Sequence, residues 1–335
     1  MNPFVGAQVH TLVENIRLLE VLVTAPLGLY SDIRMLRQAL PIEEAADLPR
    51  SESGQRRIAY RGLTDENGRL ALLAIAQIEV SLDMLDGVEK AGDAGPRPEW
   101  TSQARRVMAR ARQKAGGDLR SNTASKIEGL YVIVDPKATN GRPVADVAEA
   151  ALRGGARVVQ LRDKSGSRDD VLAVSRRLRS VCDQHGALFI MNDDPALAVL
   201  SDAHGLHLGQ ADLTVPDARR ILEPHQIAGR SNNGQEELAA SVSMGADYLA
   251  VGAVFATSTM GKSGRPAVGT EMVAKAKEAS DIPVVAIGGI NRDNVAEVVR
   301  AGADCVCVVS AVTLTDDPEA AASALVEAIQ NAKPS

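Results

Sequence analysis

The chain has 335 residues, of which 45% are hydrophobic, so it can bury one large core or two ordinary ones. Its formal net charge of -6 gives no general affinity for polyanions, and an aromatic content of only 2% argues against a stacking surface for single-stranded nucleic acid. We therefore expect no nucleic-acid partner, and any phosphate site must be local.

Residues 21–29 form the longest apolar run, but a threonine and a proline interrupt it, and it is too short to span a bilayer. No cationic N-terminal segment precedes an apolar core. These features predict a soluble, cytoplasmic protein with no membrane partner, and they leave homo-oligomer formation open. Cys182, Cys305 and Cys307 lack metal-ligand spacing, and we interpret them as reduced thiols of the core.

Residues 1–120 carry apolar residues at helical spacing and no convincing strand, which predicts a small all-α domain. Its helices are expected at residues 9–23, 33–40, 70–88 and 100–114. The last of these is rich in arginine, at Arg105, Arg106, Arg110 and Arg112. Ion pairing of these arginines on a solvated face is favoured over phosphate binding. Small polar residues between 116 and 125 indicate a linker, so the predicted domains are 1–120 and 127–335, joined by residues 121–126.

From residue 129 onward, short β-rich runs alternate with amphipathic stretches. The expected strands are 129–135, 158–162, 188–192, 205–208, 226–229, 248–254, 284–287 and 305–309. The expected helices are 146–153, 171–182, 215–222, 236–244, 271–278, 294–300 and 318–332. Eight alternating units predict a (β/α)8 TIM barrel, an α/β fold. A doubly wound open sheet is the alternative, but it would need a glycine fingerprint where Asp135, Pro136 and Lys137 follow the first strand.

Polar residues gather where the predicted strands end, which is where barrels carry their chemistry. Gln160, Arg162 and Lys164 occupy alternate positions and so leave one face of the second strand. Two cations and an amide on one face suit an anion site, because arginine offers a planar fork of donors and lysine a point charge. A strand edge with solvated charges is the plainer interpretation of these three residues alone.

Asp193 and Asp212 follow the third and fourth strands, which are neighbours in a barrel, so their carboxylates can approach one cation. Oxygen ligands beside Arg and Lys suit Mg²⁺ that carries a diphosphate, and they do not suit zinc. Glycines in residues 286–290, followed by residues 308–310, lie where barrels commonly hold a phosphate on backbone N–H groups. Residues 252–269 form a long loop of the kind that closes over substrate.

With these motifs in place, residues 129–335 resemble thiamine phosphate synthase along their whole length. The matching segments are Gln160-Leu-Arg-Asp-Lys164, Asn192-Asp193, His207-Leu-Gly-Gln-Ala-Asp212, Gly229-Arg-Ser231, Val254-Phe-Ala-Thr-Ser-Thr259, Ala286-Ile-Gly-Gly-Ile290 and Val309-Ser310. The resemblance implies a transferase of thiamine biosynthesis that joins a hydroxymethylpyrimidine diphosphate to a thiazole phosphate and releases diphosphate. The helical region weakly resembles the extra domain that precedes the synthase in some bacteria.

The resemblance also implies roles for individual residues. The pyrimidine diphosphate would be held by Gln160, Arg162, Lys164, Asn192 and Ser231. The thiazole phosphate would be held by Thr257, Thr259, Gly289, Val309 and Ser310. Asp193 and Asp212 would bind Mg²⁺, and the catalytic cations would be Arg162, Lys164 and Lys262. In the family mechanism diphosphate leaves first, and a pyrimidinylmethyl cation is then captured by the thiazole nitrogen, so no general base is needed.

Two positions depart from the family pattern. Asn232 and Asn233 stand where the family usually has a histidine soon after the serine. Met260 stands where a lysine usually follows the second threonine, and Lys262 lies two positions later. A thiazole tautomerase, which binds the same thiazole phosphate and moves a proton, is one alternative function. A non-catalytic thiazole-phosphate-binding regulatory barrel is the other, in which these departures would mark lost activity.

Overall fold

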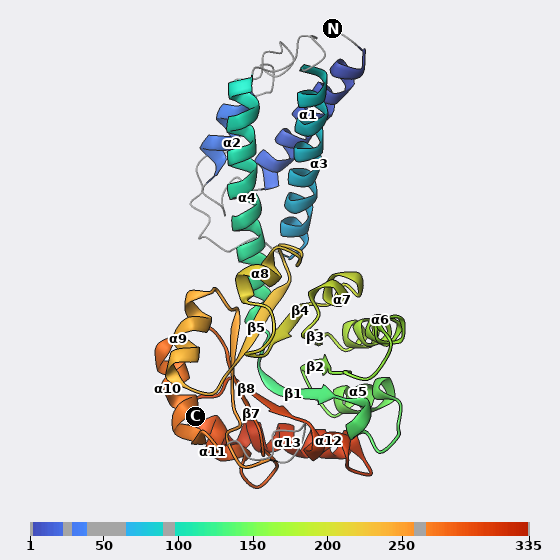
Figure 1. The fold of residues 1–335 in the computed structure, drawn as a ribbon, viewed down its shortest axis with the longest axis vertical. Helices are drawn as coiled ribbons and strands as arrows, with labels where there is room; N and C mark the ends of the chain where they lie inside the picture. Colours follow the sequence, from blue (N-terminus) through green and yellow to red (C-terminus); the bar gives the residue numbers. More distant parts are fainter. Residues whose placement is uncertain (1–2, 23–28, 39–64, 90–97, 258–265, 334–335) are drawn as a thin grey trace. The chain divides into compact units, whose positions relative to one another are not determined.

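The structure is a computed structural model that describes residues 3–22, 29–38, 65–89, 98–257 and 266–333. It divides into two compact units, residues 1–119 and residues 120–335 (Figure 1). None of the helices in these described ranges is both long enough and apolar enough to cross a membrane. The expected all-α domain followed by a TIM barrel is confirmed.

The first unit is helical in all its described residues except Leu29. Its elements are α1 (Pro3–Leu22), α2 (Tyr30–Gln38), α3 (Asp65–Glu89) and most of α4 (Pro98–Ala124). Leucine, isoleucine and alanine side chains on the facing sides of these helices form one buried core. Helix α4 continues as far as Ala124, so the prediction of an irregular linker over residues 116–125 is wrong for residues 116–124. Two consecutive glycines there did not end the helix.

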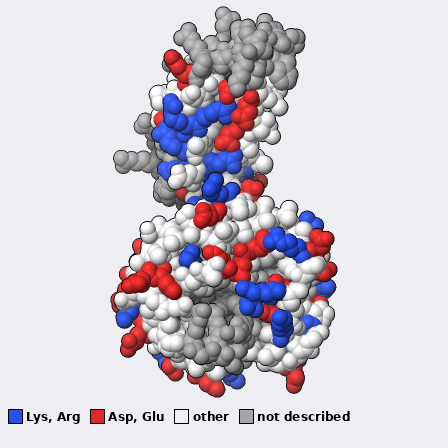
Figure 2. All heavy atoms as spheres, viewed as in Figure 1, with Lys and Arg blue, Asp and Glu red and all other residues white. Residues whose placement is uncertain are grey.

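Three of the four arginines singled out in α4, namely Arg105, Arg110 and Arg112, are paired with acidic residues of the same unit, as expected. Arg105 bonds both Asp83 and Asp86, and Arg112 bonds Glu79. Figure 2 shows basic and acidic side chains lying next to each other on this unit. A solvated ladder of ion pairs between α3 and α4 therefore accounts for this stretch of the sequence, and each such pair contributes little stability by itself.

The second unit is a closed barrel of eight parallel strands in sequential order. The strands are β1 (Gly129–Val134), β2 (Val158–Leu161), β3 (Leu188–Asn192), β4 (Gly205–Leu208), β5 (Ile227–Asn232), β6 (Tyr248–Val251), β7 (Val284–Ile287) and β8 (Cys305–Val308). All eight predicted strands are present. The largest differences lie at β5, which extends through Asn232, and at β6, which already ends at Val251.

The helices outside the barrel are α5 (Val144–Arg153), α6 (Arg168–Gln184), α7 (Pro195–Leu200), α8 (Val215–Arg219), α9 (Gln235–Ser243), α10 (Gly269–Ala279), α11 (Val295–Arg300), α12 (Ser310–Thr313) and α13 (Pro318–Ala332), with a 3-10 turn η2 (Pro136–Ala138). No expected range covered α7 or α12, although α8 and α11, of five and six residues, were predicted, so helix length alone does not explain the omission. Helix α7 is set by its start, where the Asp194 carboxylate accepts the N–H groups of Ala196 and Leu197 at 3.0 and 3.1 Å.

Strand alternation separates two layers of core. Side chains that face outward pack against the helices, and those that face inward fill the barrel lumen, including Tyr131, Tyr248, Cys305 and Cys307. The cysteines are free and buried, as expected. Gly229 makes room for one large ring, because a Cβ atom there would lie 1.9 Å from Cζ of Tyr248.

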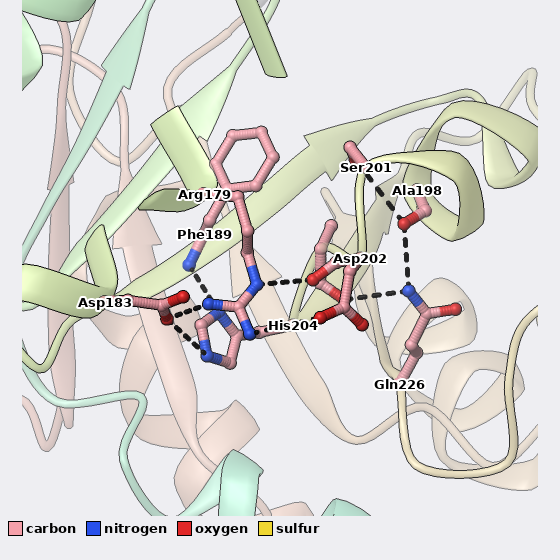
Figure 3. Close-up of polar contacts among 9 residues, drawn as sticks. Arg179, Asp183, Phe189, Ala198, Ser201, Asp202, His204 and Gln226 are labelled. Carbon is pink, nitrogen blue, oxygen red and sulfur yellow. Dashed lines mark hydrogen bonds and ion pairs between the residues drawn. The ribbon is translucent and has the colours of Figure 1, made fainter. Parts of the chain in front are cut away.

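A polar cluster ties the N-terminal ends of β3, β4 and β5 to α6 and α7 (Figure 3). The Gln226 side chain is 1% exposed and donates to the carbonyls of Ala198 and Ala203 at 3.0 and 2.8 Å. The Nδ1 atom of His204 accepts the Phe189 N–H at 3.0 Å. The Gln226 amide thus supplies a donor to the Ala203 carbonyl and a further donor to the Ala198 carbonyl, which also accepts the Ala203 N–H at 2.9 Å. This cluster lies at the end of the barrel opposite the strand C-termini.

Replacing Gln226 with leucine should lower the free energy of unfolding of the barrel by about 2 kcal/mol, because two buried carbonyls lose a donor. Urea unfolding followed by far-UV circular dichroism would measure this. Fluorescence of Trp100, the one tryptophan in the sequence, reports the helical unit and should keep its transition. Leucine at the exposed Gln184 is the matched control. Equal midpoints for both variants would contradict the assigned role of Gln226.

Candidate active site at the C-terminal ends of the strands

Gln160 stands at the centre of a hydrogen-bonded row that crosses the barrel. Its Oε1 atom accepts the Tyr131 hydroxyl at 2.7 Å, and its Nε2 atom donates to Oδ1 of Asn192 at 2.7 Å. Gln160 is buried on the lumen side of β2, where a polar side chain needs such partners. Gln160 and Asn192, chosen from the sequence, therefore contact each other directly.

Arg162 follows β2 and is held by a buried carboxylate. Its Nη1 atom bonds Oδ2 of Asp135, the residue after β1. The other oxygen of Asp135 accepts the Lys137 N–H at 2.9 Å and so caps the turn η2. This second bond fixes the carboxylate, which in turn fixes the guanidinium at the strand end. The sequence placed Asp135 among the strand-end residues but gave it no such role.

Lys164, Asp193 and Asp212 form a charged group at the C-terminal ends of the strands. The Nζ atom of Lys164 lies 2.8 Å from Oδ2 of Asp193, and the carboxyl groups of Asp193 and Asp212 are close enough to share a proton. The backbone of Asp193 has φ +63°, in the left-handed region, where aspartate is tolerated better than most residues. Oδ2 of Asp212 accepts the Gly209 N–H at 2.7 Å.

The two carboxyl groups titrate in opposite directions. Burial alone would raise the pKa of Asp193, but its bonds with Lys164 and Asp212 lower that pKa overall. Burial raises the pKa of Asp212, and the neighbouring Asp193 raises it further. Two close carboxylates repel each other, so a proton or a cation between them is favoured. The pair therefore suits a bound cation.

Two oxygen donors fit Mg²⁺, which usually takes one or two carboxylates and completes its shell with water and phosphate oxygens. Within the described ranges, no cluster of three or more His, Cys, Asp or Glu residues has the arrangement of a metal site. The carboxylates of Asp193 and Asp212 are thus donors of the kind that Mg²⁺ takes.

His207 links the lumen to Ser231, and sequence reasoning gave it no role. Its Nε2 atom lies 2.9 Å from the Ser231 hydroxyl, and its Nδ1 atom lies 3.1 Å from the Tyr248 hydroxyl. The Tyr248 hydroxyl lies 3.5 Å from that of Tyr131, which reaches Gln160. A chain of polar contacts thus joins Ser231 to Asn192 across the lumen. Strand alternation could have identified the two tyrosines as inward-facing residues.

A cavity of about 420 Å³ lies beside β7 and β8. Its lining includes Thr257, Gly289, Val309 and Ser310, four of the residues assigned to the thiazole phosphate. Gly289 has φ +66°, and a Cβ atom there would lie 2.6 Å from the Ala256 carbonyl oxygen. Glycine is therefore required for this close backbone approach. Backbone N–H groups at such a glycine turn are available to an anion.

Two further residues assigned from the sequence, Thr259 and Lys262, lie outside the described residues, as does Met260. Asn232, at the position of the family histidine, is fully buried and turned outward from β5. Its Oδ1 atom accepts the Ser241 hydroxyl at 2.6 Å, so this side chain joins β5 to α9. The backbone N–H of Asn233 donates to Glu237 at 2.6 Å. Asn232 thus serves packing.

A closed parallel barrel with its polar groups at the strand C-termini places the chain among the TIM-barrel enzymes. The profile of a family described as thiamine monophosphate synthase matches residues 130–312, more than half of the chain. The chain belongs to this family.

Similarity to individual proteins supports the same family membership. A thiamine-phosphate synthase from Thioalkalivibrio sulfidiphilus is 44% identical over 206 residues, which cover 61% of this chain and 97% of the relative. One from Synechocystis is 33% identical over 314 residues, covering 91% of this chain and 89% of the relative, so that similarity extends into the helical unit. The solved structure of thiamine phosphate pyrophosphorylase from Pyrococcus furiosus is 35% identical with a TM-score of 0.57, covering 62% of this chain and 97% of its own.

The titration of Asp212 should depend on the charge of Asp193. Changing Asp193 to asparagine removes a neighbouring negative charge, so the pKa of Asp212 should fall toward its ordinary value while the contribution of burial remains. Carbon-detected NMR titration of the carboxyl groups in metal-free protein would measure the shift. The same change at the more distant Asp146 is the control. An unchanged pKa of Asp212 would mean that the two groups do not interact.

Proposed function

We propose that the barrel condenses 4-amino-2-methyl-5-(diphosphooxymethyl)pyrimidine with 4-methyl-5-(2-phosphoethyl)thiazole to give thiamine phosphate and diphosphate. The relatives that match the barrel are named for this product. The carrying observation is the group formed by Lys164, Asp193 and Asp212, a cation beside two close carboxylates. A diphosphate with its metal ion needs such a group, whereas a single phosphate does not.

Within this proposal, each substrate has its own part of the site. Arg162 and Lys164, with Gln160, Asn192 and Ser231, hold the pyrimidine diphosphate. The cavity beside β7 and β8 holds the thiazole phosphate, with Thr257, Gly289, Val309 and Ser310 in its lining and Thr259 from the following loop. The two regions share the C-terminal end of one barrel, so the reacting atoms are brought together by positioning.

The reaction begins when the bond between the pyrimidine methylene carbon and the diphosphate oxygen breaks, with the electron pair leaving on the oxygen. Arg162 and Lys164 stabilise the negative charge that develops there. A bound Mg²⁺, held by Asp193 and Asp212, would supply further stabilisation of the leaving group. The thiazole nitrogen lone pair then forms the new carbon–nitrogen bond. Because no proton is removed from the nucleophile, a catalytic base is not required.

Incubation of the full chain with both substrates and Mg²⁺, followed by detection of thiamine phosphate, tests the function. A thiazole tautomerase would instead exchange a proton of the thiazole phosphate without the pyrimidine substrate. A binding protein would do neither. The same assay on residues 120–335 tests our further proposal that the barrel suffices, which the barrel-length relatives favour. The cytoplasmic location stays a prediction.

Alanine at Asp193 or at Asp212 should lower turnover about a hundredfold or more, the range seen when one electrostatic element of a site is lost. Chelation with EDTA should abolish turnover in the parent protein, and excess Mg²⁺ should restore it. Alanine at Asp163, a neighbouring carboxylate that bonds its own loop, is the matched control. Full turnover in the presence of EDTA would exclude the metal role.

We propose that Lys262 takes the place of the family lysine absent at Met260. The flanking Gly261 and Gly264 let a long, flexible cation reach the diphosphate. Alanine at Lys262 should lower turnover about tenfold or more with unchanged thermal stability, a smaller loss than at Asp193 or Asp212 because Arg162 and Lys164 remain. Adding Met260→Lys to that variant should recover part of the loss.

Alanine at Lys333, beyond the last helix, serves as the control. If the Lys262 variant equals the parent in turnover and in affinity for the pyrimidine diphosphate, then Arg162 and Lys164 suffice.

A further inference from the structure

Arg230 is a buried cation that forms no ion pair with the residues that the structure describes. It is 7% exposed, and the other buried charged residues of the described chain form two ion pairs, Glu20 with Arg37 and Asp135 with Arg162. No carboxylate in the described ranges lies within ion-pair distance of Arg230. Burial of an unpaired charge is costly, so the position of Arg230 calls for an explanation beyond packing.

Strand alternation sets the direction of Arg230. It pairs in register with Leu208 of β4 and, like Leu208, faces away from the lumen. Its Nη2 atom donates to Oε1 of Gln210 at 3.2 Å, while Nε and Nη1 have no hydrogen-bond partner among the described residues. Among the described residues, the bond to Gln210 is therefore the hydrogen bond that holds this guanidinium in place.

Gln210 joins two parts of the candidate active site. It belongs to the loop after β4, which carries Asp212, and its Nε2 atom donates to the backbone carbonyl of Ser231 on β5. Within the same loop, Gly209 donates to the Asp212 carboxylate at 2.7 Å. The exposed loop is thus tied to β5 by one amide side chain, whose oxygen is held by Arg230.

We propose that Arg230 is a positioning residue that holds the Asp212 loop against β5 through Gln210. A guanidinium behind the loop makes a charge-assisted bond to the amide oxygen, which turns the amide N–H group toward the Ser231 carbonyl. Asp212 and Ser231 then keep a fixed separation before ligands bind. The role of the loop in metal binding rests on the function proposed above, whereas the tether itself does not.

Hydrogen–deuterium exchange of metal-free full-length protein tests the tether directly. Backbone amides in residues 209–214 should exchange about tenfold faster in Arg230→Met than in the parent protein. Loss of one hydrogen bond to a charged group changes an opening equilibrium by about that factor or more. Arg230→Lys, which keeps the charge and a donor, should show an exchange rate between those of the parent protein and Arg230→Met. Arg153→Met, a change at an exposed arginine that pairs with Glu319, should leave this segment unchanged.

Gln210 supplies a second route that does not disturb the core. Gln210→Ala should accelerate exchange of the same segment, and Arg230→Met combined with it should add little, because both act through one bond. Unchanged exchange in folded Arg230→Met, or in Gln210→Ala if Arg230→Met does not fold, would overturn the proposal. Fully additive effects of the two changes would also overturn it.

The active enzyme gives a second measurement. In Arg230→Met and Gln210→Ala, the Mg²⁺ concentration for half-maximal turnover should rise about fivefold to tenfold, as expected from loss of roughly one such bond, with a smaller change in turnover at saturating Mg²⁺. If the parent protein makes no thiamine phosphate, the proposed function fails, and the exchange experiment still decides whether the tether exists. Loop protection that depends on Arg230, with an unchanged Mg²⁺ requirement, would refute its link to the metal.

Discussion

Closure of the eight parallel strands is the constraint on which the rest of this structure depends. Because every strand runs in the same direction, the residue after each strand lies at one end of the barrel, and residues far apart in sequence meet there. Strand alternation then decides which side chain enters the lumen and which packs against a helix. Neighbouring residues on β5 consequently do unrelated work, since Ser231 contacts His207 inside the lumen and Asn232 contacts Ser241 outside it.

Ionic groups at this end of the barrel are largely paired with one another. Arg162 bonds Asp135, and Lys164 bonds Asp193. Such pairing keeps cations oriented in a half-buried setting where an isolated charge would be costly. An anion that binds here would replace, or share with, the carboxylates that already pair with Arg162 and Lys164. Because these cations are already oriented, little reorganisation would accompany its binding. The electrostatic field of the site is therefore a property of the folded barrel.

Much of the fold followed from the sequence because most strands are short apolar runs that alternate with amphipathic stretches. The expected ranges left out α7 and α12, although α8 and α11, which are no longer than α7, were predicted. For the candidate site, strand ends singled out Gln160 and Asn192, which bond each other, and Lys164 and Asp193, which form an ion pair. The bond from Asp135 to Arg162 and the contacts of His207 could not be foreseen, because they depend on the register between strands and on side-chain conformation. The helix through residues 116–124 was missed because its glycines were read as a break.

Gly229 and Tyr248 occupy a single volume in the barrel lumen. The tyrosine ring fills the space that any side chain at position 229 would need, with its Cζ atom 1.9 Å from where a Cβ would stand. A larger residue at position 229 therefore requires a smaller one at position 248. Relatives with a larger residue at position 229 should have a smaller residue at position 248. Such a pair would lack the tyrosine hydroxyl that His207 contacts. The side-chain volumes at these two positions, on the adjacent strands β5 and β6, are thus coupled.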